Sequence, residues 1–200
     1  MSRSAFLRLE WLLSLALTML SMVWAAARDL PLAATLAPGI GPLAIGVLAG
    51  AALWGTIPLL LRSAPMRRVW TEILLPFSRT LGTRDVVIIS LLSGFTEELF
   101  FRGVLLPEIG LVPSSLCFGA LHALCLVYFL WASMIGVVLG ALTLTGGSLV
   151  TAIAAHATYN LGALLLLRRA ALRAPVPAAA TPPPAARAVA ATIASPHGIG

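Results

Sequence analysis

The sequence contains few charged residues, no lysine and only two cysteines. Of its 200 residues, 10% are charged and 60% are hydrophobic. Globular domains carry about 25% charged residues, so this chain has too little polar surface for a water-soluble protein of its size. The composition therefore excludes a soluble enzyme, a disordered protein and a disulfide scaffold. It predicts a polytopic membrane protein.

The two cysteines, Cys117 and Cys125, lie in one apolar stretch. On a helix, a rise of about 1.5 Å per residue would place them about 12 Å apart, which is too far for a disulfide. We interpret both as small packing residues.

Because lysine is absent, all 13 basic residues are arginines, and the net charge is +6. The arginines gather in short patches beside apolar runs, which is typical of topology signals in membrane proteins. We therefore expect a lipid bilayer around the chain and no nucleic-acid partner. The composition, rich in alanine, arginine and proline, is typical of a bacterial protein, so we expect the inner (plasma) membrane.

The apolar runs predict an all-α, polytopic helical bundle with about six transmembrane helices. The expected spans are 9–27, 40–61, 85–106, two helices of about 16 residues within 111–145 that separate near 126–132, and 148–167. Six spans place both termini and the arginine-rich loop 62–84 on one side, so we expect an N-in/C-in topology. The first span ends in three alanines and is alternatively a cleaved signal peptide.

Three regions are expected along the chain. Residues 1–68 form a two-span region with a basic loop, residues 69–173 form the core, and the tail 174–200, rich in proline and alanine, is expected to be disordered. In loop 62–84, the apolar residues between 69 and 81 are expected along the membrane surface. Glycines four residues apart, at 46/50 and 136/140, predict close helix contacts.

The third expected span carries Glu97, Glu98 and Arg102. A charge at the centre of a membrane helix costs at least ~2.5–3.5 kcal/mol on insertion scales, so these residues require an explanation. Glu98 and Arg102 have the i,i+4 spacing, acid first, that favours a salt bridge. Glu97 is rotated by about 100° from Glu98 and is left without a partner in its own helix. It is therefore a candidate general base, although one structural ion cluster between helices is the alternative interpretation.

Two histidines lie in later apolar runs. Phe118 precedes His122 by one helical turn, and Asn160 follows His156 by one turn, so each pair shares a helix face. Counted from the expected span ends, Glu97, His122 and His156 all lie about 13–15 Å deep. A carboxylate, two imidazoles and an amide at one depth predict a site, although a single membrane histidine can equally make an interhelical hydrogen bond.

These segments resemble the CPBP family of intramembrane proteases, which includes the CAAX-prenyl endopeptidases related to Rce1. The family pattern of EExxxR, FxxxH and HxxxN is matched, in that order, at residues 97–102, 118–122 and 156–160. The resemblance covers roughly residues 69–167. It implies a glutamic intramembrane endopeptidase with no metal cofactor, whose substrate is a membrane-associated protein or peptide.

The resemblance also implies a role for each matching residue. Glu97 would activate a water molecule, with His122 sharing that water. His156 and Asn160 would form the oxyanion hole, which an amide and an imidazole suit chemically. Glu98 and Arg102 would hold the helix and position the substrate, and Phe118 would support them.

Other functions fit parts of the same pattern. Glu97, His122 and His156 could instead bind zinc and leave a fourth position for water, as in a zinc protease. Intramembrane glutamate and histidine residues also occur in proton-coupled transporters, although inverted repeats are not visible here. A third alternative is a non-catalytic bacteriocin-immunity or peptide-binding protein. The sequence leaves the oligomeric state open.

Overall fold

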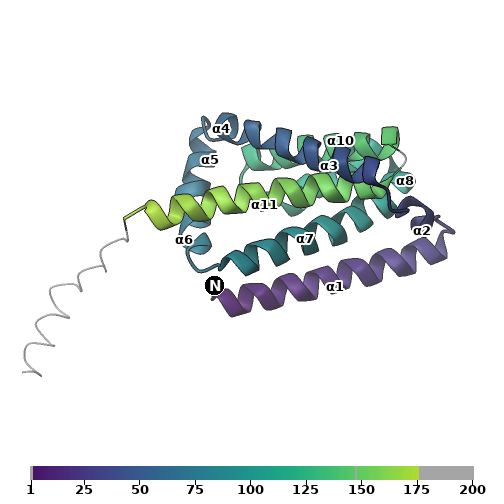
Figure 1. Ribbon diagram of the computed structural model, residues 1–200, viewed down its shortest axis with the longest axis horizontal. Helices are drawn as coiled ribbons and strands as arrows, with labels where there is room; N and C mark the ends of the chain where they lie inside the picture. The colour runs from purple at the N-terminus through teal and green to yellow at the C-terminus, as the bar shows by residue number, and fades with distance from the viewer. Residues whose placement is uncertain (1, 147, 176–200) are drawn as a thin grey trace, which may run out of the picture.

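The computed structural model describes residues 2–146 and 148–175, and the expected disordered tail lies almost wholly outside them. The described residues form helices and no strands, which confirms the all-α prediction. Five long helices run along one axis of the molecule (Figure 1). They are α1 (Arg3–Ala27), α3 (Ile40–Leu53), α7 (Thr83–Phe100), α10 (Leu126–Gly146) and α11 (Leu149–Arg173).

Shorter helical segments connect the long ones. Between α1 and α7 lie α2 (Leu32–Thr35), η1 (Trp54–Thr56), α4 (Ile57–Leu60), α5 (Ala64–Arg68), η2 (Val69–Leu74) and α6 (Leu75–Ser78). Between α7 and α10 lie η3 (Phe101–Leu105), α8 (Leu106–Ile109) and α9 (Leu111–Leu121). Helix starts follow ordinary capping, since the Ser2 and Ser148 hydroxyls accept hydrogen bonds from backbone amides of the first turns of α1 and α11.

Four helices are long and apolar enough to cross a membrane: Arg3–Ala27, Ile40–Leu60, Leu126–Gly146 and Leu149–Arg173. The chain is therefore a multi-pass membrane protein. The third expected span corresponds to α7, which continues through η3 and α8 as one helical run to Ile109 but carries more charge than the other four.

The prediction that residues 111–145 form two helices is confirmed, but the predicted boundary between them is wrong. Two helices do form, but they separate at residues 122–125, not at 126–132, and their lengths are 11 and 21 residues in place of about 16 each. At about 1.5 Å per residue, α9 is about 16 Å long, roughly half of the ~30 Å hydrocarbon core.

A side chain explains why α9 ends early. The backbone amide of His122 donates to the Gly119 carbonyl at 3.0 Å, and the His122 ring nitrogen Nδ1 donates to the Phe118 carbonyl at 2.9 Å. The ring thus replaces the backbone donor that would have continued the α-helix. The hydropathy of the sequence does not record this side-chain hydrogen bond, so the end of α9 could not be predicted from the apolar runs.

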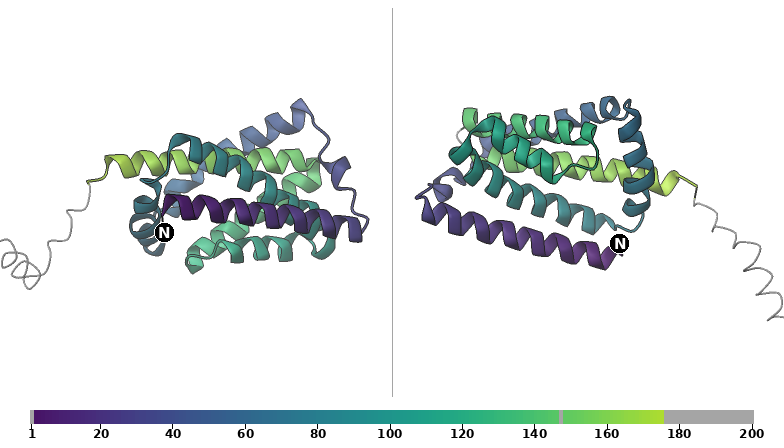
Figure 2. Two further views of the ribbon diagram at one scale, coloured as in Figure 1. Left: turned by 90° about the horizontal axis from the view of Figure 1, so that it is seen from below. Right: turned by 180° about the vertical axis from the view of Figure 1, so that it is seen from behind.

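The chain begins and α11 ends at the same end of the bundle (Figures 1 and 2). The run from α5 to α6, which belongs to the arginine-rich loop, lies across this end (Figure 1). Both termini of the described bundle and the most basic loop therefore share one side, as the N-in/C-in prediction requires; the orientation itself stays a prediction.

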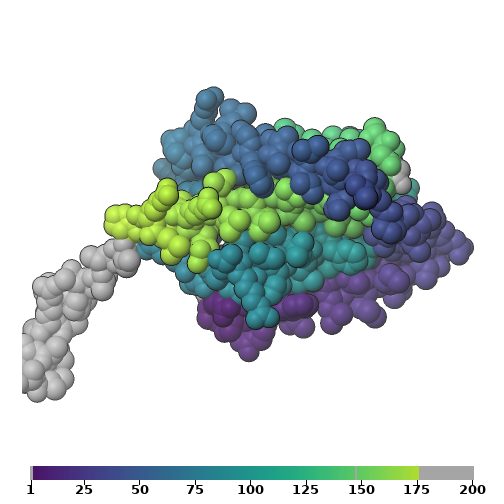
Figure 3. All heavy atoms as spheres, viewed as in Figure 1, coloured from purple at the N-terminus to yellow at the C-terminus, as the bar shows by residue number. Residues whose placement is uncertain are grey.

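Helix α11 lies between α3 and α7, which flank it in the space-filling view (Figure 3). The α3–α11 contact is close because a Cβ added at Gly46 or Gly50 would meet the backbone of α11 at Thr151 and Ala155. Gly136 and Gly140 of α10 lie similarly close to Ser115 and Leu111 of α9. The glycine pairs predicted to mark close contacts are thus confirmed.

Helix α1 packs along α7 (Figure 1), and ion pairs near its two ends join it to the helical run from α7 to α8. Arg3 binds Asp85 through two hydrogen bonds of 2.6 and 2.7 Å, and Arg28 pairs with Glu108 at 3.0 Å. Between these pairs, Ala25 joins a buried cluster with Leu99 of α7. The first apolar run therefore forms one wall of the bundle.

Candidate active site

The two neighbouring acids of α7 lie in different surroundings. Glu98 is fully buried, and its Oε1 accepts hydrogen bonds from Arg102 Nη1 and from His156 Nδ1, each at 2.7 Å. Arg102 also donates from Nη2 to the Gly136 carbonyl at 3.0 Å. The predicted Glu98–Arg102 salt bridge is confirmed, and it forms one buried cluster that joins α7, η3, α10 and α11.

Arg102 lies in η3, a π-helical stretch that interrupts the run from α7 to α8. Pro107 lacks an amide hydrogen, so the α-helical bond to the Gly103 carbonyl cannot form, and a wider turn is tolerated here. Short π-helical stretches often occur at functional sites because they redirect side chains. In this chain the stretch follows directly after the EExxxR glutamates.

Glu97 faces His122, away from the Glu98 cluster. Its Oε2 lies 3.5 Å from His122 Nε2, and the two side chains are 15% and 29% exposed. Glu97 Oε2 is buried and has no hydrogen-bond partner among the described residues. The contact is too long for a direct hydrogen bond.

The hydrogen bond at the other ring nitrogen fixes the chemistry of this pair. The Phe118 carbonyl can only accept, so His122 Nδ1, at 2.9 Å, must carry the proton. In a neutral ring, Nε2 is then an acceptor that faces a carboxylate oxygen, itself an acceptor. In that state one water molecule with two hydrogens could donate to both acceptors, whereas a protonated ring would form an ion pair with Glu97.

The same reasoning applies to His156. Its Nδ1 faces the Glu98 carboxylate at 2.7 Å and so carries a proton, which leaves Nε2 as the other polar atom of the ring. Phe118 packs between the two histidines, with ring centroids 4.5 Å from His122 and 5.7 Å from His156. The Arg102 guanidinium lies 4.5 Å from the Phe118 centroid. Phe118 therefore fixes both imidazoles and the buried arginine.

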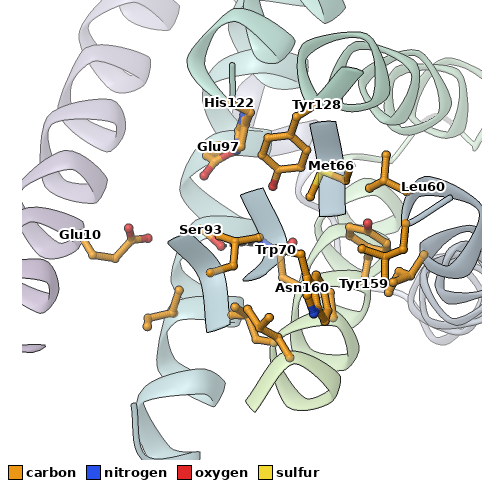
Figure 4. A pocket seen from close by; sticks show the side chains of 17 residues that line it. Glu10, Leu60, Met66, Trp70, Ser93, Glu97, His122, Tyr128, Tyr159 and Asn160 are labelled. Atoms are coloured by element: carbon orange, nitrogen blue, oxygen red, sulfur yellow. Dashed lines mark hydrogen bonds and ion pairs between the residues drawn. The ribbon is translucent and has the colours of Figure 1, made fainter. Parts of the chain in front are cut away.

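Glu97 and His122 line a cavity of about 260 Å³ (Figure 4). Asn160 lies on its α11 side and donates from Nδ2 to Ser93 Oγ at 3.0 Å. His156 does not line this cavity but a smaller one of about 50 Å³. The two cavities share His122, Tyr128, Tyr159 and Asn160 as lining residues, so the four predicted site residues line two adjacent cavities.

Most of the cavity wall is apolar, and much of it comes from the basic end of the bundle. Met66, Trp70 and Leu74 of the α5–η2 run line it together with Leu164 and Leu167 near the end of α11. The cavity therefore extends from Glu97 and His122 toward the end where the termini and the arginine-rich loop lie (Figures 1 and 4).

Several residues that line this cavity were not predicted from the sequence as site residues. Ser93 holds Asn160, Tyr128 and Tyr159 belong to both hollows, and Glu10 reaches in from α1 (Figure 4). Glu10 carried a usable signal, because it is an acid inside the apolar first span. Ser93, one turn before Glu97, could have been found from the helical period, whereas no pattern singled out the tyrosines.

The residues of the zinc alternative are divided between the two clusters. Glu97 and His122 face each other, but Nδ1 of His156 is bound to Glu98. Among the described residues, no group of three or more histidines, cysteines or acids is arranged to hold a metal ion. The bond to Glu98 leaves His156 Nε2 available, as in many metal-bound histidines, so the zinc alternative stays a prediction.

Residues 80–162 match the family described as type II CAAX prenyl endopeptidase Rce1-like. The matched stretch covers 83 of the 200 residues. All three matching motifs and both clusters of the site lie within it. No curated protein and no solved structure matches the chain. This match and the apolar helices together support a multi-pass membrane endopeptidase with a protein substrate.

Proposed function

We propose that the chain is a glutamic intramembrane endopeptidase whose catalytic residues are Glu97, His122, His156 and Asn160, and that it acts in the inner (plasma) membrane of a bacterial cell. The observation that carries the proposal is the pair of acceptors, Glu97 Oε2 and His122 Nε2, which face each other 3.5 Å apart at a cavity. A water molecule that donates to both is held with its oxygen free to act as a nucleophile.

In the first step, the Glu97 carboxylate takes a proton from this water as its oxygen attacks the scissile carbonyl carbon. A C–O bond forms, and the π-electron pair of the carbonyl moves onto its oxygen. Asn160 retains an N–H beyond the one donated to Ser93, and this N–H stabilises the oxyanion. The protonated His156 ring would donate a further hydrogen bond to the oxyanion from Nε2.

In the second step, the C–N bond breaks and the carbonyl re-forms. The proton held by Glu97 passes to the departing amine, so the carboxylate is regenerated as the base for the next cycle. Water must reach this depth, and the polar side chains that line the two adjacent cavities provide a place for it.

The test compares terminal peptides in cells that carry the wild type, Glu97→Gln or Glu97→Ala, at matched membrane abundance. We expect defined protein termini to disappear in both variants, and these termini identify the substrate. A membrane-associated protein or peptide is expected. Identical profiles in folded, equally abundant variants would contradict the proposal and favour transport or binding.

We further propose that the reaction needs no metal. Activity of the purified protein should survive chelators, and metal analysis should find no stoichiometric zinc. A stoichiometric zinc lost together with activity would establish the zinc alternative.

A further inference from the structure

Glu10 is a carboxylate inside an apolar helix. It lies in α1, which is long and apolar enough to span a membrane, and its side chain is half-buried. An ionisable residue in such a segment usually has a function and a partner. It lies outside residues 80–162, which match the Rce1-like family, so the family motifs do not account for it.

The position of Glu10 connects it to the reaction site. Its side chain extends from α1 toward the cavity lined by Glu97 and His122, on the α1 side of Ser93 (Figure 4). If the scissile peptide bond lies at Glu97, a neighbouring residue of the substrate would lie near Glu10.

The carboxylate has no partner among the residues that the structure describes. Among the described residues, no hydrogen bond or ion pair engages it, and Glu97 acts on it as a like charge. Arg3 is engaged by Asp85, and Arg8 is exposed on another face of α1. Of the described residues that line the cavity, none is an arginine. Two carboxylates thus face one mostly apolar cavity without a resident cation.

A cation in this cavity would be attracted by both carboxylates. Aromatic residues add to this attraction for a cation, because the faces of aromatic rings attract cations. Three of them, Trp70, Tyr128 and Tyr159, line the cavity. The long apolar stems of lysine and arginine would pack against the leucines and isoleucines of the wall.

We propose that Glu10 is a specificity-determining residue that binds a lysine or arginine side chain of the substrate near the scissile bond. This inference rests on the proposed protease function. It assigns Glu10 to substrate selection and not to the chemical step.

The experiment uses the full chain in cells and the cells' own proteins as the probe. Terminal peptides are compared for the wild type, Glu10→Gln, Glu10→Arg and Glu97→Ala, with Glu72→Gln as a matched control at an exposed acid outside the cavity. Glu97-dependent sites should carry a basic residue at a fixed distance from the cleaved bond. In Glu10→Gln, cleavage at basic sites should fall about tenfold more than at neutral sites, the effect of losing one charge-assisted bond.

Charge reversal sharpens the test, because Glu10→Arg should shift the preference toward acidic residues. If Glu10→Arg fails to accumulate, the nearly isosteric Glu10→Gln still decides. Equal losses at all sites, or an unchanged preference, would overturn the proposal, as would Glu97-dependent sites with no basic residue. If Glu97→Ala removes no termini, the protease function itself fails and this inference fails with it.

Discussion

The two glutamate–histidine pairs of this site use the same residue types and differ in almost everything else. Glu98 and His156 are in contact at 2.7 Å, fully or almost fully buried, and held further by Arg102. Glu97 and His122 lie 3.5 Å apart beside a cavity, and Glu97 Oε2 is unpaired among the described residues. Oε2 of Glu98 also has no hydrogen-bond partner among the described residues, so the two pairs do not differ in the number of unpaired oxygens. They differ because Glu98 Oε1 binds both Arg102 and His156 away from the cavity, which makes that pair a scaffold, whereas the Glu97–His122 pair faces the cavity without a direct hydrogen bond.

The largest effect is expected at Glu97. Glu97→Gln removes the base without changing side-chain size, and general base catalysis contributes about 10²–10⁴-fold, so activity should fall by at least that range. Thermal unfolding in detergent should change little, since Glu97 makes no hydrogen bond that the variant would lose. A strong loss of stability would show that Glu97 belongs to the scaffold after all.

The reverse pattern is expected at Glu98. Glu98→Gln leaves the buried Arg102 guanidinium without a counter-charge, and breaking a buried ion pair from one side costs about 3–5 kcal/mol. Folded yield and unfolding temperature should both drop. The double variant Glu98→Met/Arg102→Met should recover much of that stability because it buries no charge. If the double variant recovers none of the lost stability, the cluster must stabilise the fold through its hydrogen bonds or packing as well as through paired charges.

The two roles of His122 can be separated by His122→Asn. The asparagine Nδ2 can still donate to the Phe118 carbonyl and end α9, but it offers nothing in place of Nε2. Cleavage should therefore fall by about 10²-fold or more while the unfolding temperature stays near that of the wild type. Similar activity in the variant would contradict the shared-water geometry.

A smaller effect is expected at Ser93, which holds Asn160 and does not touch the reacting atoms. Ser93→Ala frees one N–H of Asn160, and turnover should fall by up to about tenfold, the value of one neutral hydrogen bond. Ser90→Ala is the matched control, because that hydroxyl bonds only to the Val86 carbonyl within the same helix. Equal losses in both variants would indicate a general effect on α7.

Parts of this structure could be predicted from the sequence because they depend on helical geometry. The Glu98–Arg102 pair and the separate direction of Glu97 follow from positions along one helix. So do the close contacts at Gly46 and Gly50. The catalytic roles of the motif residues stay predictions that the experiments above test.

Other features depend on side-chain contacts and helix packing that the periodicity of the sequence does not indicate. The end of α9 is set by the His122 ring in competition with a backbone amide, and the π-helical stretch at Arg102 interrupts an otherwise regular apolar run. The pairing of His156 with Glu98 depends on how α7 and α11 meet. Trp70 and Met66 reach the cavity because the run from α5 to α6 folds across the end of the bundle.

The short helix α9 also has a consequence for the surrounding lipid. Its outer face is apolar at Val112, Leu116 and Leu121, yet it covers only about half of the hydrocarbon thickness. Lipid beside it must thin or the protein must tilt, and this mismatch is concentrated next to His122, where α9 ends. The enzyme should therefore work faster in vesicles of short-chain lipids than in thick ones, and equal rates in both would show that the neighbouring helices shield α9 from the bilayer.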